Sequence, residues 1–247
     1  MKKNPIFAPH LHKRIMAKQT ETTQDPIANV EDALTKSELF IEKNQKLLLM
    51  ILGGIILVVG GFFAYRNYVV KPHELEAQAA IFRAERFFEK DSFQLALNGK
   101  DKAEGFLSII DNYSGTKTGN LAHYYASVCY LHLGKYQECL DQMDQFDADD
   151  VMLGAMSVGV KGDALMELNR TDEAIEMYTK AASTNENSFT SPMYLMKAGV
   201  ANEIKGDYNK ALELYQKIRK NYFSSNEGRE VEKYIARAEL MVKQGGK

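Results

Sequence analysis

A chain of 247 residues is long enough for one or two domains, and its hydrophobic fraction of 45% allows a sizeable core. Lysine and arginine number 31 against 33 acidic residues, so the formal net charge is −2 and no strong basic field exists to hold nucleic acid. The two cysteines, Cys129 and Cys139, match neither a disulfide framework nor a metal-finger spacing. His10 and His12 lie close together, but in a polar tail where solvated side chains are a better interpretation than a metal site.

The first 46 residues are expected to form a cytoplasmic tail. Residues 1–32 show little apolar periodicity, which predicts a mostly disordered segment. From Glu31 onward the pattern becomes helical, with Leu39 and Phe40 on a partly amphipathic face. We therefore expect a juxtamembrane helix at the end of the tail.

Residues 47–65 form an apolar run without a single charged residue. Nineteen residues at about 1.5 Å each cover roughly 28 Å, close to the hydrocarbon thickness of a bilayer. A cleaved signal peptide is disfavoured because a long tail precedes the run and bulky residues follow it. A buried soluble helix is disfavoured because such helices seldom lack polar residues on every face. The run is therefore interpreted as an uncleaved transmembrane helix whose surroundings are membrane lipid.

Basic residues beside this run give a slight preference for one orientation. Lys36, Lys43 and Lys46 precede the span, whereas Arg66 and Lys71 follow it. Because the side with more lysine and arginine tends to stay in the cytoplasm, the N-terminus is expected there.

Four glycines within the span, Gly53, Gly54, Gly60 and Gly61, form two pairs with a spacing of seven residues. Seven steps of about 100° return each pair to one face, which would let another helix approach closely. Glycine is also generally frequent in transmembrane helices. Both interpretations stay open.

The span is followed by a predicted linker over residues 66–76. Val69 to Pro72 is expected to be a short connector, because proline disfavours helix in the residue before it.

The rest of the chain repeats itself with a period near 34 residues, which predicts an all-α solenoid of helical hairpins. The strings LGKYQECL (133–140), LNRTDEAI (168–175) and KGDYNKAL (205–212) are three copies of one turn-and-helix element. A weaker fourth copy is KDSFQLAL (90–97), and residues 98–105 form an insertion after it. The predicted array covers residues 77–223 as four units: 77–116, 120–150, 155–188 and 192–223. Residues 224–247 supply a capping helix that closes the open end of the solenoid.

Small residues recur at fixed places in these units, where two antiparallel helices must touch closely. Gly162 and Gly199 lie twelve positions before Ala174 and Ala211. The full set of predicted repeat-packing residues is Ala84, Ala96, Ser127, Cys139, Gly162, Ala174, Gly199 and Ala211. Together with an aromatic residue at the turn, as at Tyr136, this spacing matches the tetratricopeptide repeat (TPR) pattern.

The first helices of TPR hairpins line a concave surface, so their register predicts a protein-binding groove. Its candidate residues are Tyr124, Val128, Leu131, Met156, Met166, Met193, Met196 and Ile204. Methionine is flexible and polarizable, which suits a surface that accepts varied apolar partners. Several of these residues could instead pack between neighbouring units. Cys129 and Cys139 are expected to be buried small hydrophobes, with a disulfide between them left open. No catalytic grouping or phosphate-binding loop is visible, so neither an enzyme nor a cofactor site is expected.

The lead Phe40–Asn44–Lys46 into the span, the exit Tyr65-Arg66-Tyr68 and the repeat type together resemble the ancillary SecYEG translocon subunit family. The resemblance covers about residues 36–245, and the longer tail and the 98–105 insertion are similar to versions seen in Bacteroidota. It implies a single-span protein of the bacterial inner membrane whose TPR domain lies in the periplasm. The implied partners are SecYEG channel subunits and a membrane-anchored prolyl-isomerase-like chaperone, and the implied role is help for emerging polypeptides. A scaffold for envelope or cell-division complexes and an enzyme or its regulatory subunit remain as alternatives.

Overall fold

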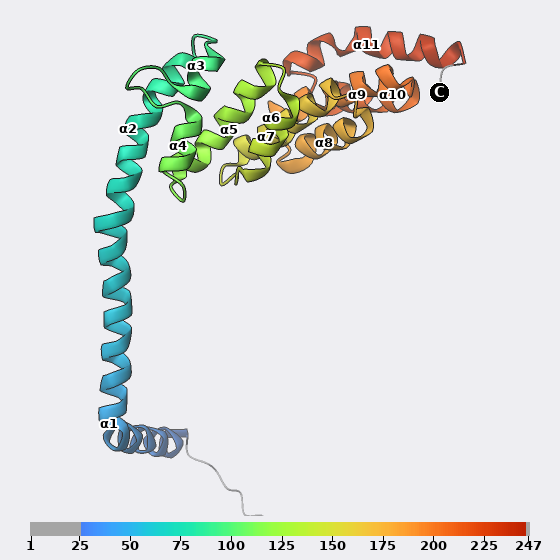
Figure 1. Ribbon diagram of the computed structural model, residues 1–247. Coiled ribbons are helices and arrows are strands. Elements are labelled where there is room, and N and C mark those ends of the chain that lie inside the picture. Colours follow the sequence, from blue (N-terminus) through green and yellow to red (C-terminus); the bar gives the residue numbers. More distant parts are fainter. Residues whose placement is uncertain (1–25, 246–247) are drawn as a thin grey trace, which may run out of the picture. The chain divides into compact units, whose positions relative to one another are not determined.

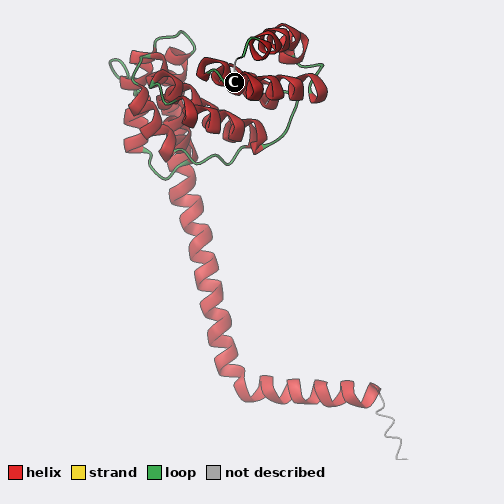
Figure 2. Ribbon diagram, turned by 90° about the vertical axis from the view of Figure 1, so that its right-hand side faces the viewer, coloured by secondary structure: helices red, strands yellow, loops and turns green. Residues whose placement is uncertain are grey.

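The computed structural model describes residues 26–245, and the expectations for the tail before residue 26, including His10 and His12, lie outside them. The chain divides into two compact units, Met1–Phe62 and Phe63–Lys247, which are described separately. Figure 2 shows helices joined by loops, and within residues 26–245 no strand is present. The predicted all-α fold class is therefore confirmed.

The first unit is dominated by α1 (Pro26–Tyr65), a helix of 40 residues. Its apolar stretch belongs to the one described helical segment that is long and apolar enough to cross a membrane. No part of that stretch is buried within the protein. Around Gly53, Gly54, Gly60 and Gly61, nothing lies within 4 Å of where a Cβ would stand. Within the described residues, no side chain therefore packs on these four glycines.

The connector predicted around Pro72 is wrong, because the backbone stays helical there. A π-helical turn, η1 (Arg66–Val70), leads into α2 (Lys71–Phe88), and the Lys71 N–H donates to the Arg66 carbonyl. Pro72 lies in the first turn of α2. Proline has no N–H to donate, and here it directly follows the π-helical turn, where the hydrogen-bond register of the helix shifts.

After η1, the second unit continues with α2 and two short helices, α3 (Phe93–Asn98) and α4 (Phe106–Asn112). The predicted insertion is the loop between these two helices. It is closed by an antiparallel bridge in which Lys100 N–H donates to the Ala103 carbonyl at 3.0 Å and Ala103 N–H donates to Lys100 at 2.8 Å. The insertion therefore splits the second helix of the first hairpin into two pieces.

Three regular hairpins follow, and Figure 1 shows their helices succeeding one another along the second unit. They are α5 (Lys117–His132) with α6 (Tyr136–Gln145), α7 (Val151–Glu167) with α8 (Thr171–Thr184), and α9 (Thr190–Lys205) with α10 (Tyr208–Asn221). Each turn within a hairpin contains one residue with positive φ: Gly134 at 72°, Asn169 at 58° and Gly206 at 86°. Asparagine tolerates this left-handed conformation, so the turn between α7 and α8 forms without glycine. The last helix, α11 (Asn226–Lys243), packs on α10 and α9.

The second unit contains two clusters of buried apolar side chains. One runs from Ile81 of α2 to Cys129 of α5, and the other from Cys139 of α6 to Ala238 of α11. Tyr130 packs against both. The second cluster supports the hairpins that carry the candidate site.

Candidate protein-binding site

The eight small residues predicted at the repeat crossings are all buried. At Gly162 a Cβ would lie 2.6 Å from Cε1 and 2.7 Å from Cδ1 of Tyr178, on the second helix of the same hairpin. At Gly199 the corresponding clash is with Tyr215 of α10. In both hairpins a tyrosine ring from the second helix therefore occupies the space left by the missing side chain.

A third glycine makes a similar contact between neighbouring hairpins. A Cβ on Gly159 of α7 would overlap the ring of Tyr194, which belongs to α9. The rings of Tyr178 and Tyr194 are roughly parallel, with centroids 6.5 Å apart. The two tyrosines therefore join α7, α8 and α9 into one packed group.

A polar cluster lies at the edge of this group. Asp163 Oδ1 accepts a hydrogen bond from the Tyr178 hydroxyl at 2.7 Å. Lys197 Nζ donates to both carboxylate oxygens of Asp163 at 2.7 Å and lies 5.7 Å from the centre of the Tyr178 ring. Burial, and then the negative charge of Asp163, raise the pKa of Tyr178 well above its ordinary value, so its hydroxyl stays a donor.

Two adjoining hollows flank this polar cluster, each with a volume of about 290 Å³. The first is lined by Leu131, Tyr136, Asp163, Met166, Glu167 and Tyr178. The second is lined by Asp163, Met166, Tyr178, Met196, Lys197, Val200 and Ala201. Because they share Asp163, Met166 and Tyr178, we call them the paired hollows. The walls of the first hollow are mostly polar and those of the second mostly apolar, with the Asp163–Lys197 ion pair between them. Apolar walls with a few fixed polar groups are typical of sites that bind other molecules.

The paired hollows bring together three of the eight predicted groove residues, Leu131, Met166 and Met196. Tyr124 is only 8% exposed, and its ring contacts Phe146 with centroids 5.5 Å apart, so it is a core residue. Ile204 is 65% exposed and lies outside the hollows. The remaining three, Val128, Met156 and Met193, are half-buried and line neither hollow.

Sequence reasoning missed the polar members of the site. Asp163 follows Gly162 directly and Lys197 precedes Gly199 by two positions, so both lie beside the crossing glycines. A charged residue beside a glycine at a helix crossing is therefore a pattern in the sequence that could have indicated both as candidate site residues. The contact between Asp163 and Lys197 could not be predicted from the sequence alone, because the two residues are 34 positions apart on different hairpins.

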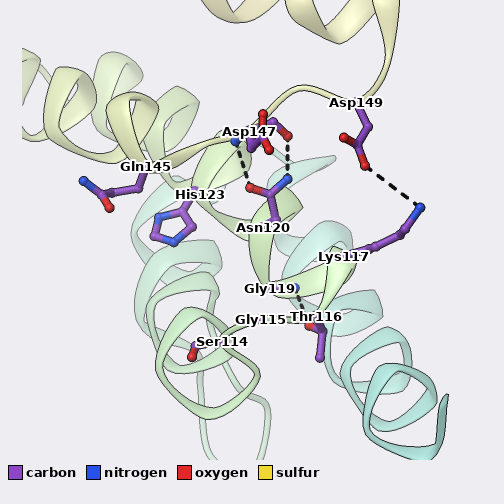
Figure 3. A pocket seen from close by; sticks show the side chains of 10 residues that line it. All are labelled: Ser114, Gly115, Thr116, Lys117, Gly119, Asn120, His123, Gln145, Asp147 and Asp149. Atoms are coloured by element: carbon purple, nitrogen blue, oxygen red, sulfur yellow. Dashed lines mark hydrogen bonds and ion pairs between the residues drawn. The ribbon is translucent and has the colours of Figure 1, made fainter. Parts of the chain in front are cut away.

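A further hollow lies at the start of α5, and its side chains mostly serve the local turns (Figure 3). Asn120 Nδ2 donates to the Asp147 carbonyl at 2.7 Å, and Asp147 N–H donates to Asn120 Oδ1 at 2.9 Å. Thr116 Oγ1 accepts from Gly119 N–H at 2.8 Å. The Lys117 N–H, at the same helix start, donates to Glu74 Oε2 at 2.7 Å. These contacts cap and join elements of the array.

The two cysteines are free and fully buried. Burial raises the pKa of Cys129 to about 12 and that of Cys139 to about 11. Such thiols are almost entirely protonated near neutral pH, and the thiolate is the reactive form. Within the part of the chain that the structure describes, no group of three or more His, Cys, Asp or Glu side chains is placed to hold a metal ion.

Comparison with known families finds tetratricopeptide repeats in two segments, residues 158–188 and residues 194–222. These segments contain most of α7 with α8, and most of α9 with α10, the hairpins that form the second hollow. A search of curated proteins returns no match to the sequence. TPR hairpins are protein-interaction elements and are typically found in non-catalytic adaptors. The protein is therefore a TPR-containing protein whose repeats imply protein partners.

Proposed function

We propose that this protein is a non-enzymatic, membrane-anchored TPR adaptor that assists the Sec protein-translocation channel from the periplasmic side of the bacterial inner membrane. Two features support an anchored adaptor: a long apolar helix with no buried face, and TPR hairpins on the same chain. The Sec assignment depends on the family resemblance of the span and its flanking residues. On this proposal the partners are SecYEG channel subunits and a membrane-anchored prolyl-isomerase-like chaperone.

On this proposal each segment of the chain has its own role. Residues 1–46 form the cytoplasmic tail and residues 47–65 the membrane span. Residues 66–76 lead into the array through helical backbone. Residues 77–223 form the interaction array, and residues 224–247 cap it.

The observation that carries the interaction role is the pair of hollows on α7 and α9. Met166 and Met196 are flexible and can reshape around different apolar side chains of a bound polypeptide. The Asp163–Lys197 ion pair beside them offers donors and acceptors for the polar backbone of an extended segment. A site of this composition suits emerging polypeptides of varied sequence better than one fixed small ligand.

A photo-crosslinking experiment in native membranes tests the proposal. A photoreactive amino acid replaces Met196 within the second hollow, and the matched control replaces Phe223, an exposed residue in the loop before α11. We expect crosslinks to channel subunits, the chaperone or nascent chains at Met196, and few at Phe223. Purification of the crosslinked full-length protein in mild detergent identifies these partners.

Two outcomes would overturn parts of the proposal. Crosslinks at Met196 to cell-wall or outer-membrane assembly factors would replace the Sec role by the scaffold role and leave the hollows as the site. Equal crosslinking at Met196 and Phe223 would remove the paired hollows as the interaction site.

A further inference from the structure

Helix α2 has apolar residues on two nearly opposite faces. Ala77, Ile81 and Ala84 are buried against the array, whereas Leu75 is 64% and Phe82 is 60% exposed. At about 100° per residue, Leu75, Ala79 and Phe82 fall within a sector of roughly 60° that points away from the buried face. A helix with apolar residues on both sides is normally covered on both. Within residues 26–245 the side of α2 that carries Leu75 and Phe82 is exposed, and Ala79 at its edge lines a hollow that is open to solvent.

The exposed side has the spacing of a helix-pairing seam. Leu75, Ala79 and Phe82 follow one another at steps of four and three residues, as apolar positions do in a coiled coil. We call these three residues the α2 seam. Charged and polar residues flank it, with Lys71 and Gln78 on one side and Glu76 and Arg83 on the other. These are the positions from which residues reach across to a paired helix.

The flanking charges favour a second copy of the same chain as the occupant. Copies anchored in one membrane with the same topology start their α2 helices at the same membrane surface, so a parallel pair is expected. In a parallel pair each residue on the first flank faces the residue five positions later on the second flank of the other helix. Lys71 then meets Glu76, an opposite charge, and Gln78 meets Arg83, so these flanking pairs bring no like charges together. This step depends on the membrane anchor of the proposed function.

We propose that the protein self-associates through the α2 seam, with two copies pairing their α2 helices in parallel. The seam is short, and two apolar side chains and an alanine from each copy give only a modest contact area. Confinement of both copies to one membrane raises their effective concentration and compensates for this. In the single chain, Lys71 Nζ donates a hydrogen bond to Asn67 Oδ1 at 2.9 Å on an exposed helix face. In the pair, Lys71 can exchange this contact for an ion pair with Glu76 of the second copy.

Cysteine crosslinking of the purified full-length protein in liposomes tests the pairing, because only a second copy is present there. Leu75→Cys and Phe82→Cys place thiols on the seam, and Phe223→Cys and Leu240→Cys are controls at exposed apolar positions elsewhere. The parent chain controls for Cys129 and Cys139, which are buried. On mild oxidation we expect several-fold more disulfide-linked dimer from the seam variants than from the controls. Adding Glu76→Lys should lower the yield of the Leu75→Cys dimer, and combining it with Lys71→Glu should restore it.

Flotation of the same liposomes separates failure of this inference from failure of the anchor. Seam variants that float with the liposomes but crosslink no more than the controls would overturn the pairing and leave the anchored adaptor intact. A chain that does not float would overturn both. In native membranes, a crosslinked product of another mass at Leu75, without the dimer in liposomes, would show that a different protein covers the seam.

Discussion

The crossing glycines show how one missing side chain fixes the distance between two helices. At Gly162 the ring of Tyr178 lies where a methyl group would have to go. The ring is held in place by its hydrogen bond to Asp163 and by Lys197 next to it. It therefore has little freedom to move aside.

We predict that Gly162→Ala destabilises the second unit although alanine is the better helix former. Overpacking of this kind costs about 1–3 kcal/mol, more than the roughly 1 kcal/mol that alanine gains over glycine within a helix. Thermal or denaturant unfolding of the second unit measures the change.

The matched control is Gly154→Ala in the same helix. A Cβ there would lie 3.7 Å from the Ala148 Cβ, an ordinary contact. This variant should be neutral or slightly stabilised. If both variants unfolded at the same denaturant concentration as the parent, the close Gly162–Tyr178 packing would be wrong.

At the scale of elements, one carboxylate joins the first helix of the array to the second hairpin. Glu74 of α2 accepts from the Lys117 N–H at 2.7 Å and from the Thr118 hydroxyl at 2.6 Å, at the start of α5. A negative charge is favourable at a helix N-terminus because the free N–H groups point toward it. Glu74 therefore acts as a cap supplied by a distant segment.

The pKa of Glu74 makes this cap sensitive to acid. Burial raises its pKa, but the hydrogen bonds from Thr118, Gln78 and Lys117 together outweigh this effect and hold it below its ordinary value. A depressed pKa in the folded state contributes stability above the unfolded-state pKa of about 4.3. That contribution is lost as the pH falls through the folded-state pKa.

We predict that Glu74→Gln lowers the free energy of unfolding at neutral pH by on the order of 0.5–1 kcal/mol, since the group is partly solvated. The difference from the parent should shrink as the pH falls below about 4. Denaturant unfolding of both proteins at pH 7 and at pH 3–4 measures it. Glu239→Gln, at an exposed position of α11, should change neither value. A deficit that persisted unchanged at low pH would show that the carboxylate charge does not provide the cap.

The sequence predicts an element well where its structure depends on neighbouring residues, and poorly where it depends on contacts with residues far along the chain. Helix type, the positions of the hairpin turns and the 98–105 loop all follow from local residue patterns. The local rule for Pro72 fails because a π-helical turn directly before it keeps the backbone helical. The Glu74 cap and the Asp163–Lys197 pair join segments 43 and 34 residues apart, and no local pattern specifies such meetings.

At the scale of the whole molecule, the proposed binding role can be separated from stability. We predict that Met196→Glu lowers binding of an unfolded client protein at least tenfold, because the new charge would be left unpaired against an apolar ligand. The control is Ile204→Glu on the same helix, at an exposed position outside the paired hollows. Client binding is measured by fluorescence anisotropy, and circular dichroism checks that both variants keep their helices. Equal binding by the two variants would move the interaction surface away from the hollows.

The proposed topology makes a separate prediction. A membrane-impermeant thiol reagent added to intact cells with a permeable outer membrane should label Lys102→Cys, in the exposed loop between α3 and α4. It should not label Lys18→Cys, because the tail is expected in the cytoplasm. The native cysteines are buried and serve as the unlabelled background. The reverse labelling pattern would contradict both the orientation and the periplasmic location of the array.

The division of the buried side chains into two clusters affects the order in which segments of the array unfold under a pulling force. The paired hollows belong to the cluster that runs from α6 to α11, whereas α2, α3 and α4 belong to the other. Neighbouring clusters with few shared side chains can open one at a time. On the proposed function, a bound polypeptide would pull on the hollows while the span is held in the membrane, and we expect the α2–α4 segment to unfold before the hairpins that carry the hollows. The polypeptide would then stay bound in the hollows while the distance between the hollows and the membrane increases.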